Sequence, residues 1–298
     1  MKKLSENTIG VSMALLAIFL FSSKAILVKI IYQYEIPTVH ILLLRMVFAL
    51  PFYVGVLCFN KQKGETELQK KDYIWLVLFG MMGYYVASFF DFCGLQYLSA
   101  SLERIILFVY PTLVVIISSI FLKTKITKQQ LVAILITYAG VLMTFASELT
   151  ISHSDQVTLG AAFIFMSALT YAIYLVGSSW LIPKFGTVKF TSLAMIIACC
   201  SVILHYLITD RATITDHPTM VYAYCLVMAI FCTVLPSYLV SFAIKKLGAS
   251  RFSILGSVGP VFTISLAVIF LGESITFIQL IGVITVIIGV RIVSKKKE

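Results

Sequence analysis

The sequence predicts an all-α integral membrane protein with ten transmembrane helices, arranged as two inverted repeats of five helices each. Three observations lead to this fold class: an apolar composition, a succession of long apolar segments, and an internal repeat. Of the 298 residues, 60% are hydrophobic and 12% are charged, and the mean hydropathy is +1.01. A water-soluble chain of this length could not bury so many apolar side chains.

Ten apolar segments are long enough to cross a membrane. About 20 helical residues span the roughly 30 Å of hydrocarbon, and continuous segments of that length satisfy their own backbone hydrogen bonds only as helices. Strands of membrane barrels are about half as long and alternate in polarity. We interpret the first segment as an uncleaved span, because it is too long for a signal peptide and lacks a small-residue cleavage site. The predicted spans are 9–31, 38–60, 73–93, 100–122, 129–147, 157–179, 188–209, 220–241, 249–271 and 276–293.

The two halves of the chain repeat each other. Residues 98–143 align with residues 247–292 without a gap, and the alignment pairs proline with proline, glutamine with glutamine and glycine with glycine. Shared apolar composition alone would not produce these matches. Five spans per copy is an odd number, so the second copy enters the membrane in the opposite orientation. The repeat therefore predicts two five-helix domains, 1–150 and 151–298.

The basic residues predict the orientation. The formal net charge is +10, and when loops are assigned alternately to the two sides, most lysines and arginines fall on the side of the N-terminus. This positive-inside asymmetry places both termini in the cytoplasm, in the cell (plasma or inner) membrane. It also accounts for the basic excess, so we expect no nucleic-acid partner. The tail 294–297 is expected to contact anionic lipid.

The sequence offers no pattern for a metal, cofactor or enzyme. The six cysteines lie in or at the ends of apolar spans, without a CxxC pair, and we interpret them as small buried hydrophobic residues. No nucleotide-binding loop or hydrolase motif is present. We expect no cofactor, no metal and no enzymatic activity.

Both halves contain a set of motif residues. In the second half they are Gly248-Ala249-Ser250, Pro260, Leu271-Gly272-Glu273, Gln279 and Gly282. In the first half they are Gly10, Arg45, Ser99-Ala100-Ser101, Pro111 and Gln130. By these residues the chain resembles the EamA-domain family of the drug/metabolite transporter superfamily, most closely in its second half. The first half departs at Thr124, where the family often has glutamate. The resemblance implies ten spans in two inverted halves and a cavity lined mainly by spans one to four and six to nine.

The resemblance also implies a function. Proteins of this family are secondary carriers that move amino acids, their breakdown products, purine-type metabolites or small drugs, often outward. We therefore expect a secondary active transporter that exports small metabolites by alternating access, with a small-molecule substrate and membrane lipid as partners. Such a carrier could couple to protons and could be a monomer or a homodimer. The alternatives are an intramembrane enzyme and a non-transporting scaffold or receptor.

Five ionisable residues lie inside predicted spans, where each charge costs roughly 3 kcal/mol. They are Lys24, Arg45, Asp91, Glu103 and Arg104. Asp91 and Glu103 are equally far from the turn between spans three and four, and Lys24 and Arg45 from the turn between spans one and two, so all five are expected in the outer half of the membrane. Their counterparts in the second half are uncharged, which is typical of a dedicated polar site.

Two interpretations of these charges remain open. They could neutralise one another between packed helices. Alternatively, Arg45 and Lys24 bind a substrate anion, while Asp91 or Glu103 meets an ammonium group or carries a coupling proton.

Aromatic residues and prolines give further candidates. Tyr85, Phe89, Tyr110 and Tyr174 are expected to line a cavity, with helix packing as the alternative. Three prolines interrupt spans four, eight and nine, where each removes a helical hydrogen bond and kinks the helix. These prolines, which could hinge the bundle or only pack, are Pro111, Pro236 and Pro260.

Overall fold

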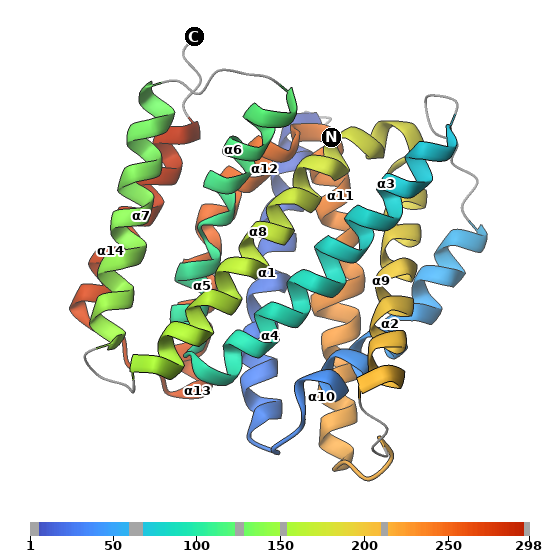
Figure 1. The fold of residues 1–298 in the computed structure, drawn as a ribbon, viewed down its shortest axis with the longest axis horizontal. Helices are drawn as coiled ribbons and strands as arrows, with labels where there is room; N and C mark the ends of the chain where they lie inside the picture. The colour runs from blue at the N-terminus through green and yellow to red at the C-terminus, as the bar shows by residue number, and fades with distance from the viewer. Residues whose placement is uncertain (1–5, 60–67, 123–127, 150–153, 210–213, 295–298) are drawn as a thin grey trace, which may run out of the picture.

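The protein is an all-helical bundle in a computed structural model that describes residues 6–59, 68–122, 128–149, 154–209 and 214–294 (Figure 1). Within these ranges no strand occurs. The first half contains α1 (Glu6–Tyr32), α2 (Thr38–Phe59), α3 (Lys70–Gly80), η1 (Met81–Val86), α4 (Ala87–Tyr97), α5 (Ala100–Leu107), α6 (Tyr110–Leu122) and α7 (Lys128–Leu149). The second half contains α8 (Ser154–Phe185), α9 (Thr187–Thr209), α10 (Thr219–Ala229), η2 (Ile230–Val234), α11 (Leu235–Leu247), α12 (Ala249–Leu255), η3 (Gly256–Val258), α13 (Gly259–Leu271) and α14 (Phe277–Ser294).

The helices confirm a multi-pass membrane protein. Among the described residues, 7 helical segments are long and apolar enough to cross a membrane. They are Thr8–Tyr32, Thr38–Phe59, Lys70–Tyr97, Ala100–Phe121, Asp155–Phe185, Thr187–Thr209 and Thr219–Leu247. A shorter apolar helix covers Gly259–Leu271, and α7 and α14 cover the fifth and tenth predicted spans.

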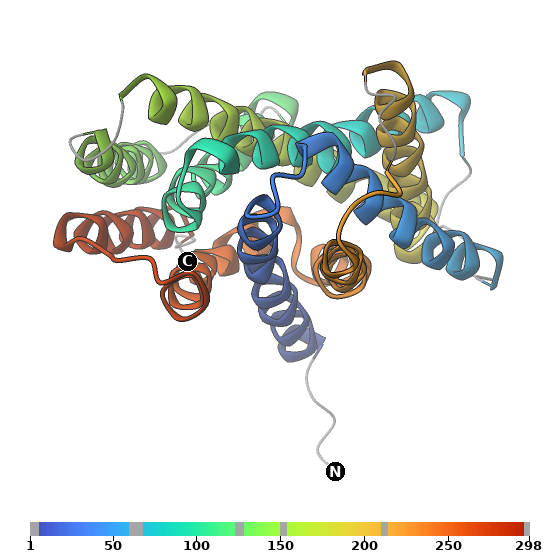
Figure 2. The same ribbon diagram turned by 90° about the horizontal axis from the view of Figure 1, so that it is seen from below.

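The first helix of each half packs against the other half. Helix α1 contacts α11 and α13, while α8 contacts α4 and α6. Helix α2 packs on α9, and α7 packs on α14 at one edge of the bundle (Figures 1 and 2). The contacts of α1 with the second half are thus equivalent to the contacts of α8 with the first half. The central helices α1 and α8 are thus held by both halves, and the space between them is shared.

Helix ends rich in lysine gather on one side of the bundle. Helix α3 begins and helices α8 and α11 end along the upper edge of Figure 1, where α1 also begins and α14 ends. These ends carry Lys70, Lys71, Lys184, Lys245 and Lys246.

Close contact between α4 and α8 depends on a glycine. A Cβ atom added at Gly94 would lie 2.4 Å from Cδ1 of Ile164, which is fully buried. Real Cβ atoms do not approach carbon so closely, so a larger residue would force the two helices apart. This contact sets the position of α4 against α8, and with it the position of Asp91, the charged residue that α4 carries.

Within the described ranges, four irregular turns interrupt the long helical segments. The turns η1 and η2 are π-helical, and their first residues, Met81 and Ile230, are separated by the offset that relates residues 98–143 to 247–292. The other two turns are the break between α5 and α6 at residues 108–109 and the 3-10 turn η3. Three of these irregularities end two residues before Pro111, Pro236 and Pro260. Turn η1 contains no proline, and the sequence did not predict it.

Candidate functional site

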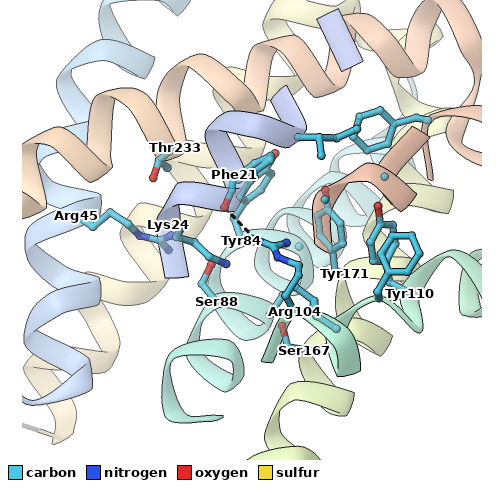
Figure 3. A pocket seen from close by; sticks show the side chains of 18 residues that line it. Phe21, Lys24, Arg45, Tyr84, Ser88, Arg104, Tyr110, Ser167, Tyr171 and Thr233 are labelled. Atoms are coloured by element: carbon cyan, nitrogen blue, oxygen red, sulfur yellow. Dashed lines mark hydrogen bonds between the residues drawn. The ribbon is translucent and has the colours of Figure 1, made fainter. Parts of the chain in front are cut away.

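A cavity of about 90 Å³ lies between the two halves (Figure 3), with room for several water molecules. Its lining comes from α1, α2, η1, α4, α5 and α6 of the first half and from α8, η2, α12, η3 and α13 of the second. Its aromatic walls are Phe21, Tyr84, Phe108, Tyr110, Tyr171 and Phe252. Its cationic and hydroxyl groups are Lys24, Arg45, Arg104, Ser88, Ser167 and Thr233.

All four irregular turns contribute to this lining. Tyr84 belongs to η1, Thr233 to η2, Phe108 to the break between α5 and α6, and Gly256 to η3. Irregular backbone at membrane depth is tolerated where it is buried in protein or lines a cavity, and π turns are frequent at functional sites. The geometry of the helices therefore singles out the same place as the charges do.

Lys24 and Asp91 form a buried ion pair at the edge of the cavity. The Lys24 Nζ donates to Asp91 Oδ2 at 2.5 Å, joining α1 to α4. The Asp91 side chain is 1% exposed and the Lys24 side chain 12%. For this pair, opposite charges neutralise each other between packed helices, which is one of the two interpretations of the buried charges. The other Asp91 oxygen, Oδ1, has no hydrogen-bond partner among the described residues.

Glu103 lies against Asp91 and is fully buried. Its relative exposure is 0%, and the two carboxyl groups are close enough to interact directly. Neither Glu103 oxygen has a hydrogen-bond partner among the described residues. A buried carboxylate without a donor is unfavourable by several kcal/mol. The hairpin of α4 and α5 thus brings the two carboxyls together, whereas the sequence predicted only a similar depth for them.

Arg104 is held by neutral oxygens. Its Nε donates to Thr263 Oγ1 at 2.8 Å, and its Nη2 donates to the carbonyl of Phe21 at 3.1 Å, which is the dashed bond in Figure 3. These bonds join α5 to α1 and α13. Arg104 therefore faces the cavity from a fixed position.

Arg45 has unused hydrogen-bond donors. Its side chain extends from α2 toward Lys24 (Figure 3), and its Cζ lies 4.8 Å from the ring centroid of Phe92, a cation–π distance. Its Nε and Nη2 are buried without a hydrogen-bond partner among the described residues. A planar guanidinium with two free donors fits a carboxylate in bidentate geometry.

The aromatic candidates separate into two groups. Tyr110 lines the cavity, whereas Tyr174 is fully buried behind it, with its ring 5.0 Å from that of Tyr84. Tyr85 and Phe89 lie outside the described lining. Both pack edge-to-face on His205 of α9, at 5.7 Å and 5.0 Å between ring centroids.

Several lining residues carried no sequence signal of their own. Ser88, Ser167 and Thr233 are common residues in apolar spans, and only their helical phase brings them to the cavity. Gly256 is a special case, because a Cβ added there would lie 1.9 Å from the hydroxyl oxygen of Tyr110. The missing side chain at Gly256 provides the space that the Tyr110 hydroxyl occupies.

A second polar cluster, here called the terminal clasp, consists of Lys29, Glu273 and the turn between α4 and α5. The Glu273 carboxylate accepts from Ala100 N at 2.8 Å, from Ser101 N at 3.1 Å and from Ser101 Oγ at 2.6 Å. It thereby satisfies amides at the N-terminus of α5, where the helix dipole favours an anion.

Lys29 completes the terminal clasp from α1. Its Nζ donates to the carbonyls of Leu95 and Leu98 at 3.1 Å and 3.0 Å, at the end of α4. The clasp therefore fastens α1, α5 and the end of α13 at one point. The corresponding residue in the first half, Thr124, lies outside the described residues.

A helical membrane bundle that encloses a charged, aromatic-lined cavity is typical of a membrane transporter. The sequence profile of the EamA-like transporter family matches residues 8–146 and again residues 158–295. The chain therefore belongs to this family, which is part of the drug/metabolite transporter superfamily.

Curated relatives agree with this assignment, and a solved structure shows the same fold. The chain is 30% identical over 287 residues to the uncharacterized transporter YcbK of Bacillus subtilis (strain 168), covering 94% of this chain and 91% of that protein. It is 29% identical over 239 residues to the uncharacterized transporter YyaM of the same organism, covering 79% and 77%. A solved chain described as "Crystal structure of protein" has the same fold, with a TM-score of 0.70 and 14% identity over 95% of each chain.

Proposed function

We propose that this protein is a secondary active transporter that exports small metabolites, such as amino acids or related compounds, by alternating access. The observation that carries the proposal is the charged cavity where irregular turns from both halves meet, namely η1 and the α5–α6 break with η2 and η3. A carrier needs a binding site near the middle of the membrane whose walls can move.

The proposed motion follows from two inverted five-helix repeats that together form ten spans. The contacts of α1 with α11 and α13, and of α8 with α4 and α6, are equivalent under exchange of the halves. Two such packings can alternate, opening the cavity to one side and then to the other. In this proposal the lysine-rich edge of Figure 1 is cytoplasmic, as are both termini.

The charged residues are proposed to bind the substrate and couple it to protons. Arg45 offers its free donors to a carboxylate, with Lys24 beside it. Asp91 and Glu103 are the groups available to carry a proton. Transport would then be coupled to the movement of protons.

Flux in proteoliposomes tests the transport function. A thermal-shift screen over amino acids, purines and organic acids and cations selects substrates, and counterflow measures their transport. We expect Arg45→Ala and Asp91→Asn to lower flux by at least about tenfold, because each removes a buried charge at the cavity. Glu35→Gln, in the exposed α1–α2 turn, serves as the control and should transport normally. Normal flux in both cavity variants, with normal insertion and helix content, would contradict the proposal and favour a scaffold.

A further inference from the structure

The cavity presents cations to its contents and keeps the carboxyl groups behind them. Lys24, Arg45 and Arg104 belong to the described lining, whereas Asp91 and Glu103 do not. Asp91 is engaged by Lys24, and the hydrogen bonds of Arg104 go to neutral oxygens. A molecule in the cavity therefore meets positive charge and aromatic faces, and within the described lining it meets no carboxylate.

A shared proton explains the arrangement of the two carboxyl groups. Asp91 Oδ1 and both Glu103 oxygens are buried without a hydrogen-bond donor among the described residues, although the two groups lie side by side. Two ionised carboxylates cannot donate to each other, and adjacent carboxyls tend to retain one proton between them. A proton on Glu103 makes it a donor to Asp91 and removes an unpaired buried charge.

Charged side chains on α1, α2 and α5 act on this carboxyl pair. Lys24 on α1 and Arg104 on α5 act on both carboxyls, Arg45 on α2 interacts with Asp91, and α13 contributes the neutral hydroxyl of Thr263 through its bond to Arg104. An anion in the cavity draws Lys24 away from Asp91 and adds negative charge nearby. Both effects hold the shared proton more firmly.

Within the proposed transport function, on which this step rests, we propose that the cavity binds organic monocarboxylates with an aromatic or apolar body, and that binding is linked to proton uptake by the Asp91–Glu103 pair. The free Nε and Nη2 of Arg45 take the carboxylate, and the aromatic walls take the body of the molecule. Linkage is reciprocal, so the bound proton raises the affinity for the anion. The anion and its proton form an electrically neutral unit.

A substrate with an ammonium group is disfavoured by the same geometry. The ammonium of a zwitterionic amino acid would lie among three cationic side chains, Lys24, Arg45 and Arg104, with both carboxyl groups outside the described lining. Like charges in a site of low dielectric repel strongly. Of the amino acids and related compounds named in the proposed function, the preferred substrates are therefore the related acids that carry a carboxylate and no ammonium group.

Three matched ligands test this specificity. 3-Phenylpropanoate and L-phenylalanine share a ring and a carboxylate and differ by one ammonium group, and 2-phenylethylammonium has the ammonium without the carboxylate. Isothermal titration calorimetry of the purified full-length protein in detergent gives their affinities, and buffers of different ionisation enthalpy give the protons taken up. We expect 3-phenylpropanoate to bind at least about 10-fold more tightly than either other ligand. Proton uptake should rise toward one proton per anion as the pH is raised into the range where the ligand-free pair has lost its shared proton.

Variants of the pair test the proton. Wild-type affinity for 3-phenylpropanoate should weaken as the pH rises, because the proton that supports the anion is lost. Glu103→Gln should take up no proton and bind with an affinity independent of pH, and Asp91→Asn gives the same readout should Glu103→Gln fail to fold. The exposed Glu35→Gln should match the wild type. Tighter binding of L-phenylalanine overturns the substrate class. Proton uptake that is absent from the wild type at every pH, or unchanged in Glu103→Gln, overturns the linkage.

Binding and transport are separated by the choice of assay. The calorimetric result in detergent does not require movement across a membrane. Absent binding of 3-phenylpropanoate overturns the substrate class while flux of another compound still supports a transporter. Binding with proton uptake but no flux of any compound in proteoliposomes overturns the transport function and leaves the site intact.

Discussion

Replacing Glu273 with alanine is expected to lower the free energy of unfolding by about 2 to 4 kcal/mol. The carboxylate accepts from Ala100 N, Ser101 N and Ser101 Oγ. A hydrogen bond to a charged group contributes about 1.5 to 3 kcal/mol, and loss of a single helix N-cap about 0.5 to 2 kcal/mol. Since Glu273 is half-buried, water replaces part of the loss, and the expected total stays below the sum of three full bonds.

Reversible unfolding in mixed detergent micelles measures this change. Helix content followed against denaturing detergent gives the free energy for the wild type and for Glu273→Ala, and Glu35→Gln reports the effect of removing an exposed acidic group elsewhere. The control should change stability by less than about 0.5 kcal/mol. A loss below about 1 kcal/mol for Glu273→Ala would show that the terminal clasp does not hold α13 to α5, and the reasoning from its hydrogen bonds would be refuted.

Two further predictions concern packing and pH. Gly83→Ala should destabilise the protein by about 1 to 3 kcal/mol, because its Cβ would lie 2.2 Å from Cγ of the fully buried Tyr174, whereas Gly55→Ala, with no atom within 4 Å, should be neutral or slightly stabilising in the same unfolding assay. The rings of His217 and His40 share a hydrogen bond of 2.8 Å. The pKa of His217 is lowered below 6.5, first by its partial burial and second by the charge of His40. This contact should stabilise the protein fully above about pH 6.5 and progressively less as the pH falls toward the lowered pKa. The thermal unfolding temperature of the wild type should therefore depend on pH in that range more steeply than that of His217→Gln. Equal slopes would contradict a stabilising role of the contact.

The hairpin geometry could be predicted from the sequence. The turn expected at Tyr97 lies at residues 98–99, between the end of α4 and the start of α5. The sequence predicted a similar depth for Asp91 and Glu103, and in the structure the two side chains interact. Depth in the membrane depends on the count of residues from a turn, and at about 1.5 Å per residue that count is reliable over two helical turns.

The side of each helix that faces the cavity could not be predicted in the same way. Tyr84 lines the cavity, while its neighbour Tyr85 packs on His205 of α9. Both lie in η1, where the wider π turn shifts the helical phase by about 100° relative to a continuous α-helix. Because no proline marks that turn, the sequence does not indicate which of its aromatic side chains point into the cavity.

Contacts between distant segments were also beyond sequence reasoning. The Leu-Gly-Glu motif identified Glu273 as a family residue, but its partner Ala100 is 173 residues away in the chain. Only the packing of α13 against α5 brings them together.

The Lys24–Asp91 pair has a consequence for biosynthesis. Lys24, in α1, leaves the ribosome before its counter-ion, which is made 67 residues later. At about 5 to 20 residues per second, Asp91 follows after roughly 3 to 13 s. During that interval the Lys24 ammonium group has no counter-ion, and its burial in lipid is unfavourable by roughly 3 kcal/mol. It is therefore expected to stay beside the translocon or near the headgroups. Helix α1 therefore settles at its final depth only after α4 has entered the bilayer, and insertion of this chain is ordered by its own charges.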